Sequence, residues 1–272
     1  MSGAMPGWRP AMEGRTPFFA CAAEPRFPYC LYVPPGLGPD PAPLIVAVHG
    51  SDRRPEALRD LMAPFCDRHR AVLLTPLFPI GSTAPDDEPG YKFGLFRGLR
   101  YDQALLAMVA DAAARLPLAT DRFMLTGFSG GGQFALRFLM LQPHRLSAVS
   151  IGAPGYVTLL DEALPWWAGT QDFVAIFGHP PDLDAMRRVA VHLVVGADDL
   201  ETEVLRVPKG HPLWVRGAEH AGPTRVARIE ALEASLRAAG CATTLDRIPG
   251  VEHSQEGVWP AVERFLDAQF GG

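Results

Sequence analysis

The sequence contains no long hydrophobic run and no strong excess of charge of one sign. No stretch of eighteen apolar residues occurs in the 272 residues, and Met1–Arg9 lacks a basic start followed by an apolar core. We therefore expect a soluble, cytoplasmic protein that binds no membrane. The net charge is −5 at pH 7 and the basic residues are scattered, so no nucleic-acid partner is expected.

Cysteine is scarce, and the histidines are dispersed. The four cysteines show no C-x-x-C spacing and are too few for a disulfide framework in a chain of this size. Cys21 and Cys30 could face each other across a hairpin, but without an export signal we expect reduced, partly buried thiols. No H-E-x-x-H or clustered His/Cys/Asp pattern is present, so neither a metal site nor a cofactor is expected.

The overall composition is that of a globular protein. Hydrophobic residues make up 48% of the chain and charged residues 20%, which argues against disorder. The length could hold one large domain or two small ones, and the lack of a compositional break favours a single domain over 1–272. The 27 prolines and 27 glycines fall mainly between the periodic segments, which indicates long ordered loops.

Short apolar runs alternate with helical patterns, as is typical of a largely parallel sheet covered by helices on both faces. The predicted buried strands are 44–48, 71–74, 123–125, 148–151 and 192–195, and a last strand is predicted at 243–248. The predicted helices are 56–70, 101–116, 133–141, 224–239 and 258–270. Residues 18–23 and 29–33 predict an antiparallel hairpin at the edge of the sheet.

Ser129 lies between glycines, after a predicted strand and before a predicted helix, in the segment Phe123–Gly132. This is the setting of a nucleophile elbow, which holds a serine oxygen clear of the sheet, within reach of an imidazole and a substrate carbonyl. Gly127 and Gly131 would let strand and helix approach without a Cβ clash. G-x-S-x-G alone is weak, because it occurs by chance in roughly one chain of this length in ten.

The same glycine-rich run invites comparison with a phosphate-binding loop. Ser129 replaces the second glycine of G-x-G-x-x-G, and no Gly-Lys-Ser/Thr follows. Nucleotide binding is therefore not expected.

Candidates for a base and an acid follow the later strands. Asp198 and Asp199 come just beyond one predicted strand, and His253 follows the last one. Because the carboxyl ends of parallel strands share one edge, loops far apart in sequence can converge there. His211 and His220 also follow the acid, but they lie in a Pro/Gly-rich loop, so His253 is the predicted base.

The order Ser, Asp, His after such an elbow resembles that of the α/β-hydrolase family, and the resemblance covers nearly the whole chain. It implies a mostly parallel sheet of about eight strands, helices on both faces and short lid loops. It favours Asp199 over Asp198, because the family's acid commonly lies three residues after the strand-ending glycine, here Gly196. Asp198 would then be a solvated or capping carboxylate.

The resemblance also implies an oxyanion hole. One donor is expected to be the Gly130 amide, at a helix start where the dipole favours negative charge. The other is expected after Val46–Gly50, which resembles the family's HG turn, and Ser51 is the candidate. The sequence there departs from HGGG, so which amide points inward stays open. His49 is expected to be a hydrogen-bonded structural residue.

Two segments, 155–188 and 201–223, are predicted to be lid-like insertions around a fairly open cleft. Trp166 and Trp167 in the first would form part of a lid wall or would be ordinary packing residues.

The loop 90–100 carries three cations at the same predicted edge. If Lys92, Arg97 and Arg100 face the cleft, they favour a substrate with carboxylates; otherwise they are solvated.

These features predict a serine hydrolase that acts through an acyl-enzyme, with a small-molecule or polymeric acyl substrate. Ser129 would attack a carbonyl, His253 would carry the proton and Asp199 would fix the imidazole tautomer. A carboxylic ester is the predicted substrate. A peptidase, amidase or depolymerase for an acidic or polymeric substrate would use the same residues, and a non-catalytic binding protein of this fold is the alternative from another class.

Overall fold

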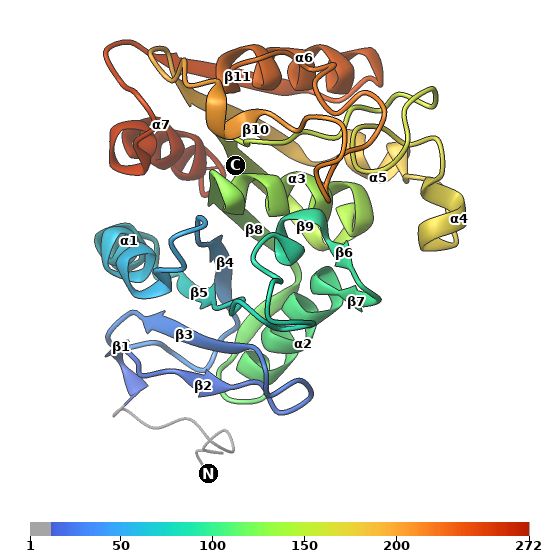
Figure 1. Cartoon of the computed structure of the whole chain (residues 1–272). Coiled ribbons are helices and arrows are strands. Elements are labelled where there is room, and N and C mark those ends of the chain that lie inside the picture. The colour runs from blue at the N-terminus through green and yellow to red at the C-terminus, as the bar shows by residue number, and fades with distance from the viewer. Residues whose placement is uncertain (1–11, 272) are drawn as a thin grey trace.

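The computed structural model describes residues 12–271, so the prediction drawn from Met1–Arg9 lies outside it. In the described part, nine strands form one sheet in the order β1-β3-β5-β4-β8-β9-β10-β11, and β2 pairs with β3 beside this path (Figure 1). The pairs from β5 to β11 are parallel, and β3 is antiparallel to β1, β2 and β5. The strands are β1 Gly14–Arg15, β2 Phe19–Ala20, β3 Pro28–Val33, β4 Ala42–Val48, β5 Val72–Pro76, β8 Leu118–Phe128, β9 Leu146–Gly152, β10 Ala190–Gly196 and β11 Thr243–Ile248.

Helices cover both faces of this sheet, which confirms the predicted class. In Figure 1, α1 and α7 lie on one side of the sheet, and α2 and α3 lie on the other. Helices α1 and α7 are in contact, since His69 Nε2 and Asp267 Oδ1 are 2.6 Å apart. Helix α6 packs against β10 and β11. The helices are α1 Pro55–His69, α2 Tyr101–Ala113, α3 Gly130–Leu141, α4 Phe173–Phe177, α5 Leu183–Arg187, α6 Arg225–Ala238 and α7 Gln255–Ala268, with short 3-10 turns η2 Gly90–Phe93, η3 Pro143–Arg145 and η4 Glu203–Leu205.

The predicted helices and strands are present, and their ends differ by a few residues for local reasons. Helix α7 begins at 255, three residues before the predicted start, because Ser254 accepts a hydrogen bond from the Gly257 amide and caps the helix. Strand β8 extends back to Leu118, where its first half pairs with β4 and keeps exposed polar residues. The hairpin of β6 (Leu95–Phe96) and β7 (Leu99–Arg100) was not predicted, since each strand has only two residues.

Two groups of buried hydrophobic residues stabilise the structure. The larger lies between the sheet and its helices and includes Val72, Leu73 and Leu74 of β5, a strand whose residues are all buried. The smaller joins η2 to both predicted insertions and consists of Phe93, Leu164, Trp167, Ala168, Val207 and Ala218. The loops over the carboxyl ends of the strands therefore have a small core of their own.

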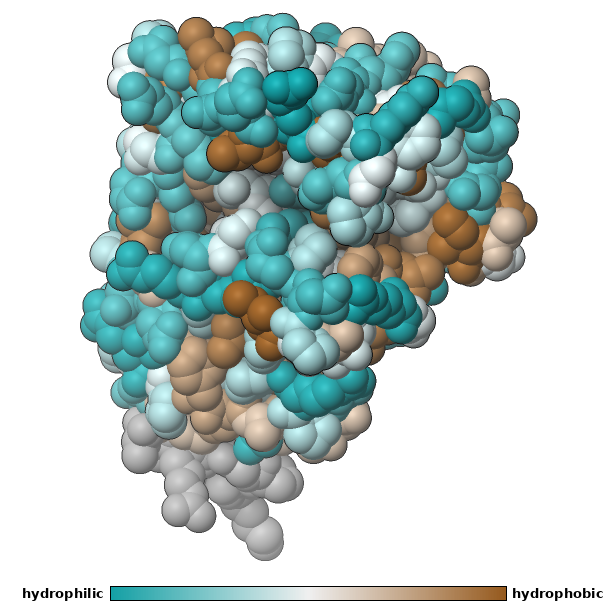
Figure 2. Space-filling model, viewed as in Figure 1, coloured by the Kyte–Doolittle hydropathy of each residue, from teal (hydrophilic) through white to brown (hydrophobic). Residues whose placement is uncertain are grey.

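All four cysteines are buried free thiols, as expected, and Cys30 Sγ lies 3.0 Å from Thr75 Oγ1. On the face seen in Figure 2, hydrophobic residues lie in scattered groups on a mostly hydrophilic surface. Within residues 12–271, no helix combines the length and the apolar character needed to cross a bilayer.

Candidate active site

Four loops of the candidate site begin at the carboxyl ends of parallel strands. Ser51 follows β4, Ser129 follows β8, Asp199 follows β10 and His253 follows β11. The shared strand direction brings these loops to one edge of the sheet, as the order of the elements predicted.

The turn at Ser129 is tight and strained. Ser129 has φ 56° and ψ −115°, a backbone conformation that residues other than glycine rarely adopt. A Cβ at Gly127 would lie 2.3 Å from the Gly131 carbonyl oxygen, and one at Gly131 would lie 2.1 Å from the Val48 oxygen. The predicted reason for these two glycines is therefore confirmed: any side chain would force α3 away from the sheet.

Ser129, His253 and Asp199 form a continuous hydrogen-bonded chain. His253 Nε2 is 3.0 Å from Ser129 Oγ, and His253 Nδ1 is 2.6 Å from Asp199 Oδ2. Since a carboxylate only accepts, Nδ1 carries the proton and leaves the Nε2 lone pair facing the serine hydroxyl. The Phe128 ring packs against the imidazole with its centroid 4.7 Å away.

The loops that carry Asp199 and His253 are joined by backbone contacts. The Asp198 amide donates to the Val251 carbonyl at 3.0 Å, and a Cβ at Gly196 would lie 2.2 Å from that same oxygen. Gly196 is thus required for the loops to meet. The Asp198 side chain is exposed, whereas the Asp199 side chain is buried against His253.

Asp199 has a second partner that the sequence did not reveal. Arg225 Nη1 donates to Asp199 Oδ1 at 2.9 Å, and both side chains are buried. Burial alone would raise the pKa of Asp199, but the hydrogen bonds and charges of His253 and Arg225 lower it below its ordinary value. Asp199 therefore stays ionised beside the imidazole.

One sequence feature could have identified Arg225. It is the first residue of α6, where the helix dipole disfavours a cation. Arg228, one turn later, donates to the carbonyls of Gly155, Leu205 and Gly222, so it ties the loop after β9 to the second insertion. A basic first turn in a helix beside the candidate acid indicates cations with buried partners.

The amides of Ser51 and Gly130 lie close together. A methyl group at Gly130 would be 3.2 Å from the Ser51 nitrogen. Within residues 12–271, neither amide donates to a protein acceptor. Gly130 is also the first residue of α3, so the helix dipole favours negative charge beside it.

His49 supports this loop and does not face Ser129. Its Nδ1 donates to the Gly50 carbonyl at 2.7 Å, and its Nε2 accepts from the Phe78 amide at 3.0 Å. Burial lowers the pKa of His49 to about 4. As expected, it is a neutral structural histidine with both ring nitrogens occupied.

A cleft of about 370 Å³ opens over the serine. Besides His253, its ionisable side chains are Asp52 and Glu256, and no Lys or Arg belongs to its lining within the described chain. The lining residues are Gly50, Ser51, Asp52, Phe128, Ser129, His253, Ser254, Gln255 and Glu256.

The expectation that Lys92, Arg97 and Arg100 form an acid-binding edge of this cleft is corrected by the structure. Arg97 is exposed and makes a bidentate ion pair with Asp86, at 2.6 and 2.9 Å. Arg100 makes a bidentate pair with Asp102, at 2.7 and 2.6 Å. Each guanidinium is already occupied by a carboxylate. Lys92 is buried and pairs with Glu88.

The two adjacent tryptophans do not line the cleft either. Trp167 is buried in the smaller core, where its Nε1 donates to the Leu213 carbonyl at 2.9 Å. Trp166 packs edge-on against Phe173 and Phe177. The packing alternative therefore describes both residues better than a lid wall.

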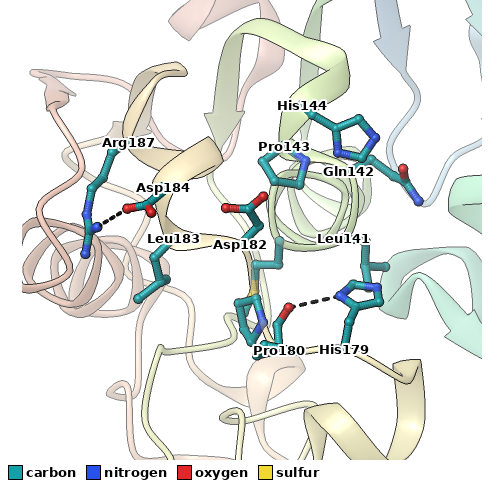
Figure 3. Close-up of a pocket in the computed structure, with 12 residues that line it drawn as sticks. Leu141, Gln142, Pro143, His144, His179, Pro180, Asp182, Leu183, Asp184 and Arg187 are labelled. Atoms are coloured by element: carbon teal, nitrogen blue, oxygen red, sulfur yellow. Dashed lines mark hydrogen bonds and ion pairs between the residues drawn. The ribbon is translucent and has the colours of Figure 1, made fainter.

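A larger hollow of about 740 Å³ lies at the far end of α3, away from Ser129 (Figure 3). Its polar groups are largely paired: Arg187 binds Asp184 at 2.6 Å and His179 Nδ1 donates to the Pro180 carbonyl at 2.9 Å. No serine, cysteine or lysine lines it. Size alone would select this hollow, but the chemistry selects the smaller cleft.

Among residues 12–271, no three His, Cys, Asp or Glu side chains are gathered as a metal would require.

No protein-family model and no curated protein matches the sequence. Solved structures do match. Poly(aspartic acid) hydrolase-1 from Sphingomonas sp. KT-1 is similar with a TM-score of 0.73 and 20% identity, over 93% of this chain and 98% of that one. A poly(3-hydroxybutyrate) depolymerase from Bordetella parapertussis gives 0.72 and 24%, over 89% and 84%. An S-formylglutathione hydrolase from Agrobacterium tumefaciens gives 0.55 and 15%, over 90% and 89%. The chain has the α/β-hydrolase fold.

We expect Gly130→Ala to disrupt the site. The added methyl would lie 2.3 Å from the buried Tyr91 hydroxyl, and overpacking of this kind costs about 1–3 kcal/mol. The free energy of unfolding should fall by that amount, and any serine-dependent activity should fall at least about tenfold as the Ser51 and Gly130 amides separate. Gly38→Ala is the control, because its methyl would meet nothing within 4 Å. Equal behaviour of the two variants would contradict the packing argument.

His49 should make stability depend on pH. Its pKa is about 4 when folded and about 6.5 when unfolded, so the unfolded chain takes up more protons between these values. Its contribution is complete above pH 6.5 and should decline by roughly 3 kcal/mol as the pH falls to 4. Denaturant unfolding of the wild type and of His49→Gln across this range should show that difference; parallel curves would mean that His49 titrates normally.

Proposed function

We propose that this chain is a serine hydrolase that cleaves a carboxylic ester through an acyl-enzyme on Ser129. The observation that carries the proposal is the chain from Asp199 through His253 to Ser129, which ends beside two amides without protein acceptors. The names of the structural neighbours, which include hydrolases and a depolymerase, support the same reaction class.

The geometry suits acyl transfer in two halves. Ser129 Oγ bonds to the substrate carbonyl carbon while its proton passes to His253 Nε2, and the carbonyl oxygen becomes an oxyanion that accepts from the Ser51 and Gly130 amides. The bond to the leaving alcohol then breaks, and the alcohol takes the proton from Nε2. In the second half, a water molecule attacks the acyl-enzyme by the same steps and releases the acyl group. Asp199 stays ionised and stabilises the imidazolium in both halves.

The cleft favours neutral or cationic substrates over acidic ones. Asp52 and Glu256 are the carboxylates in its lining, and neither forms an ion pair within residues 12–271. A preference for substrates with carboxylates required Lys92, Arg97 and Arg100 to face the cleft, and none of them belongs to its lining.

A polymer depolymerase or amidase is the second candidate. The His253 side chain is 31% exposed and the cleft is open, which would admit a chain that extends beyond the scissile bond on both sides. The two polymer-degrading hydrolases among the structural neighbours support this alternative.

The four free thiols support a reducing compartment such as the cytoplasm.

Covalent labelling tests the nucleophile. A fluorophosphonate should add once to the wild type and not to Ser129→Ala, as measured by intact mass, because only a serine activated by an imidazole reacts. Asp199→Asn removes the carboxylate that orients His253 and should lower kcat about 10³- to 10⁴-fold. Asp198 is exposed, so Asp198→Asn should change kcat less than twofold. A folded wild type that takes up no label would instead identify a binding protein.

Substrate charge tests the cleft. A carboxylated ester should show a KM up to about fivefold above that of a neutral ester of equal size, since exposed charges contribute about 0–1 kcal/mol. Asp52→Asn combined with Glu256→Gln should remove the difference, and so should high salt. A lower KM for the carboxylated ester would overturn this assignment.

A further inference from the structure

One buried cation lies next to the candidate oxyanion pocket. The chain has only two lysines, and Lys209 is exposed whereas Lys92 in η2 is 7% exposed. Lysine is almost never buried without a partner or a function, because removing its charge from water is costly.

The side chain of Lys92 fills the space that Gly130 leaves free. A methyl group at Gly130 would lie 3.2 Å from Lys92 Cε, 2.3 Å from the Tyr91 hydroxyl and 3.2 Å from the Ser51 nitrogen. Neither Lys92 nor Tyr91 lines the cleft. Lys92 Cε therefore lies close to Gly130, on the side of this residue that also faces the Ser51 nitrogen.

The charge of Lys92 is only partly neutralised. Its Nζ is 2.8 Å from Glu88 Oε1, but the Glu88 side chain is 51% exposed and its carboxylate also faces Arg53 Nη1 at 3.9 Å. Two cations thus share one hydrated anion. Of the nearby titratable groups, His49 is neutral, Tyr91 is buried with a raised pKa, and Asp52 is exposed at the cleft.

The turn that carries Lys92 is held firmly. Buried Asp87 accepts from the Gly90 amide at 2.9 Å and from the Tyr101 hydroxyl at 2.7 Å. On the other side of the lysine, Phe93 is part of the smaller core. These anchors keep Lys92 buried beside Gly130 instead of in solvent.

We propose that the buried ammonium of Lys92 stabilises the oxyanion from behind the amides of Ser51 and Gly130. The inference rests on the proposed acyl-transfer function. Lys92 forms no bond to substrate and transfers no proton; its positive charge acts across a few ångströms of low-dielectric protein on the oxygen that becomes negative. Because the charge develops in the transition state, the effect is on kcat and not on KM.

This role gives the reaction an alkaline limit. Burial lowers the pKa of Lys92, and Glu88 opposes that shift only in part. The positive charge of Lys92 is lost as the pH rises through this lowered pKa. In the wild type kcat should therefore decline on the alkaline side.

Steady-state kinetics on a neutral chromogenic ester test the proposal. Lys92→Met keeps the apolar stem and should lower kcat about tenfold with KM within twofold, and it should lose the alkaline decline. Lys92→Arg should retain most of the activity and move the decline to higher pH. Lys209→Met, which removes the only other lysine, should behave as the wild type.

Three results would overturn the proposal. These are an unchanged kcat in Lys92→Met, equal losses in Lys92→Met and Lys92→Arg, and an effect limited to KM for carboxylated esters. The last would make Lys92 a substrate-binding residue. Fluorophosphonate labelling of the wild type and of each variant separates failure of the Lys92 proposal from failure of the proposed function. A wild type that neither takes up the label nor hydrolyses the ester contradicts the function itself.

A second measurement needs no substitution in the lysine and stays decisive if Lys92→Met fails to fold. With lysine labelled with ¹³C at Cε, the chain gives two signals, and each can be titrated by NMR. A boronic acid that bonds to Ser129 places a negative charge in the pocket. The pKa of Lys92 should then rise while that of Lys209 stays constant; an unchanged Lys92 titration would contradict the proposal.

Discussion

The close approach of α3 to the sheet is the constraint on which the candidate site depends. The carbonyl oxygens of Gly131 and Val48 occupy the places where side chains at Gly127 and Gly131 would begin, so the turn between β8 and α3 closes only with glycine there. That closure holds Ser129 in its strained conformation and brings the first residue of α3 close to the Ser51 amide. Gly196 performs a similar function for the loops of Asp199 and His253.

Buried charge is arranged around this backbone frame. Asp199 carries its negative charge between His253 and Arg225, which together outweigh the cost of its burial. Lys92 is buried close to Gly130 and carries positive charge there, while Asp52 and Glu256 leave the open cleft acidic. The buried cation thus lies beside Gly130, and the two carboxylates lie at the cleft. This separation suits a reaction in which the substrate enters neutral and becomes negative only in the transition state.

The fold and the positions of the three central residues could be predicted because they depend on local patterns. Apolar runs mark β4, β5, β8, β9 and β10, and the glycines around Ser129 and Gly196 reflect steric limits that the sequence displays directly. The surroundings of the loops could not be predicted in the same way. From the sequence, Arg97, Arg100 and Trp167 are candidates for the active edge, but it does not reveal that Asp86, Asp102 and the smaller core already occupy them. Arg225 escaped notice because its partner, Asp199, comes from another loop, and nothing in the sequence indicates that Lys92 is buried against Gly130.

The central claim is that one acyl-enzyme on Ser129 is common to all substrates with the same acyl group. Partitioning with methanol tests this claim most directly: several esters that share the acyl group and differ in the leaving alcohol are hydrolysed in the presence of methanol, and methyl ester and free acid are quantified. Since the leaving alcohol has departed before methanol or water attacks, the account predicts the same product ratio for every ester. A ratio that changes with the leaving alcohol would mean that methanol and water attack the substrate itself, and would contradict the account.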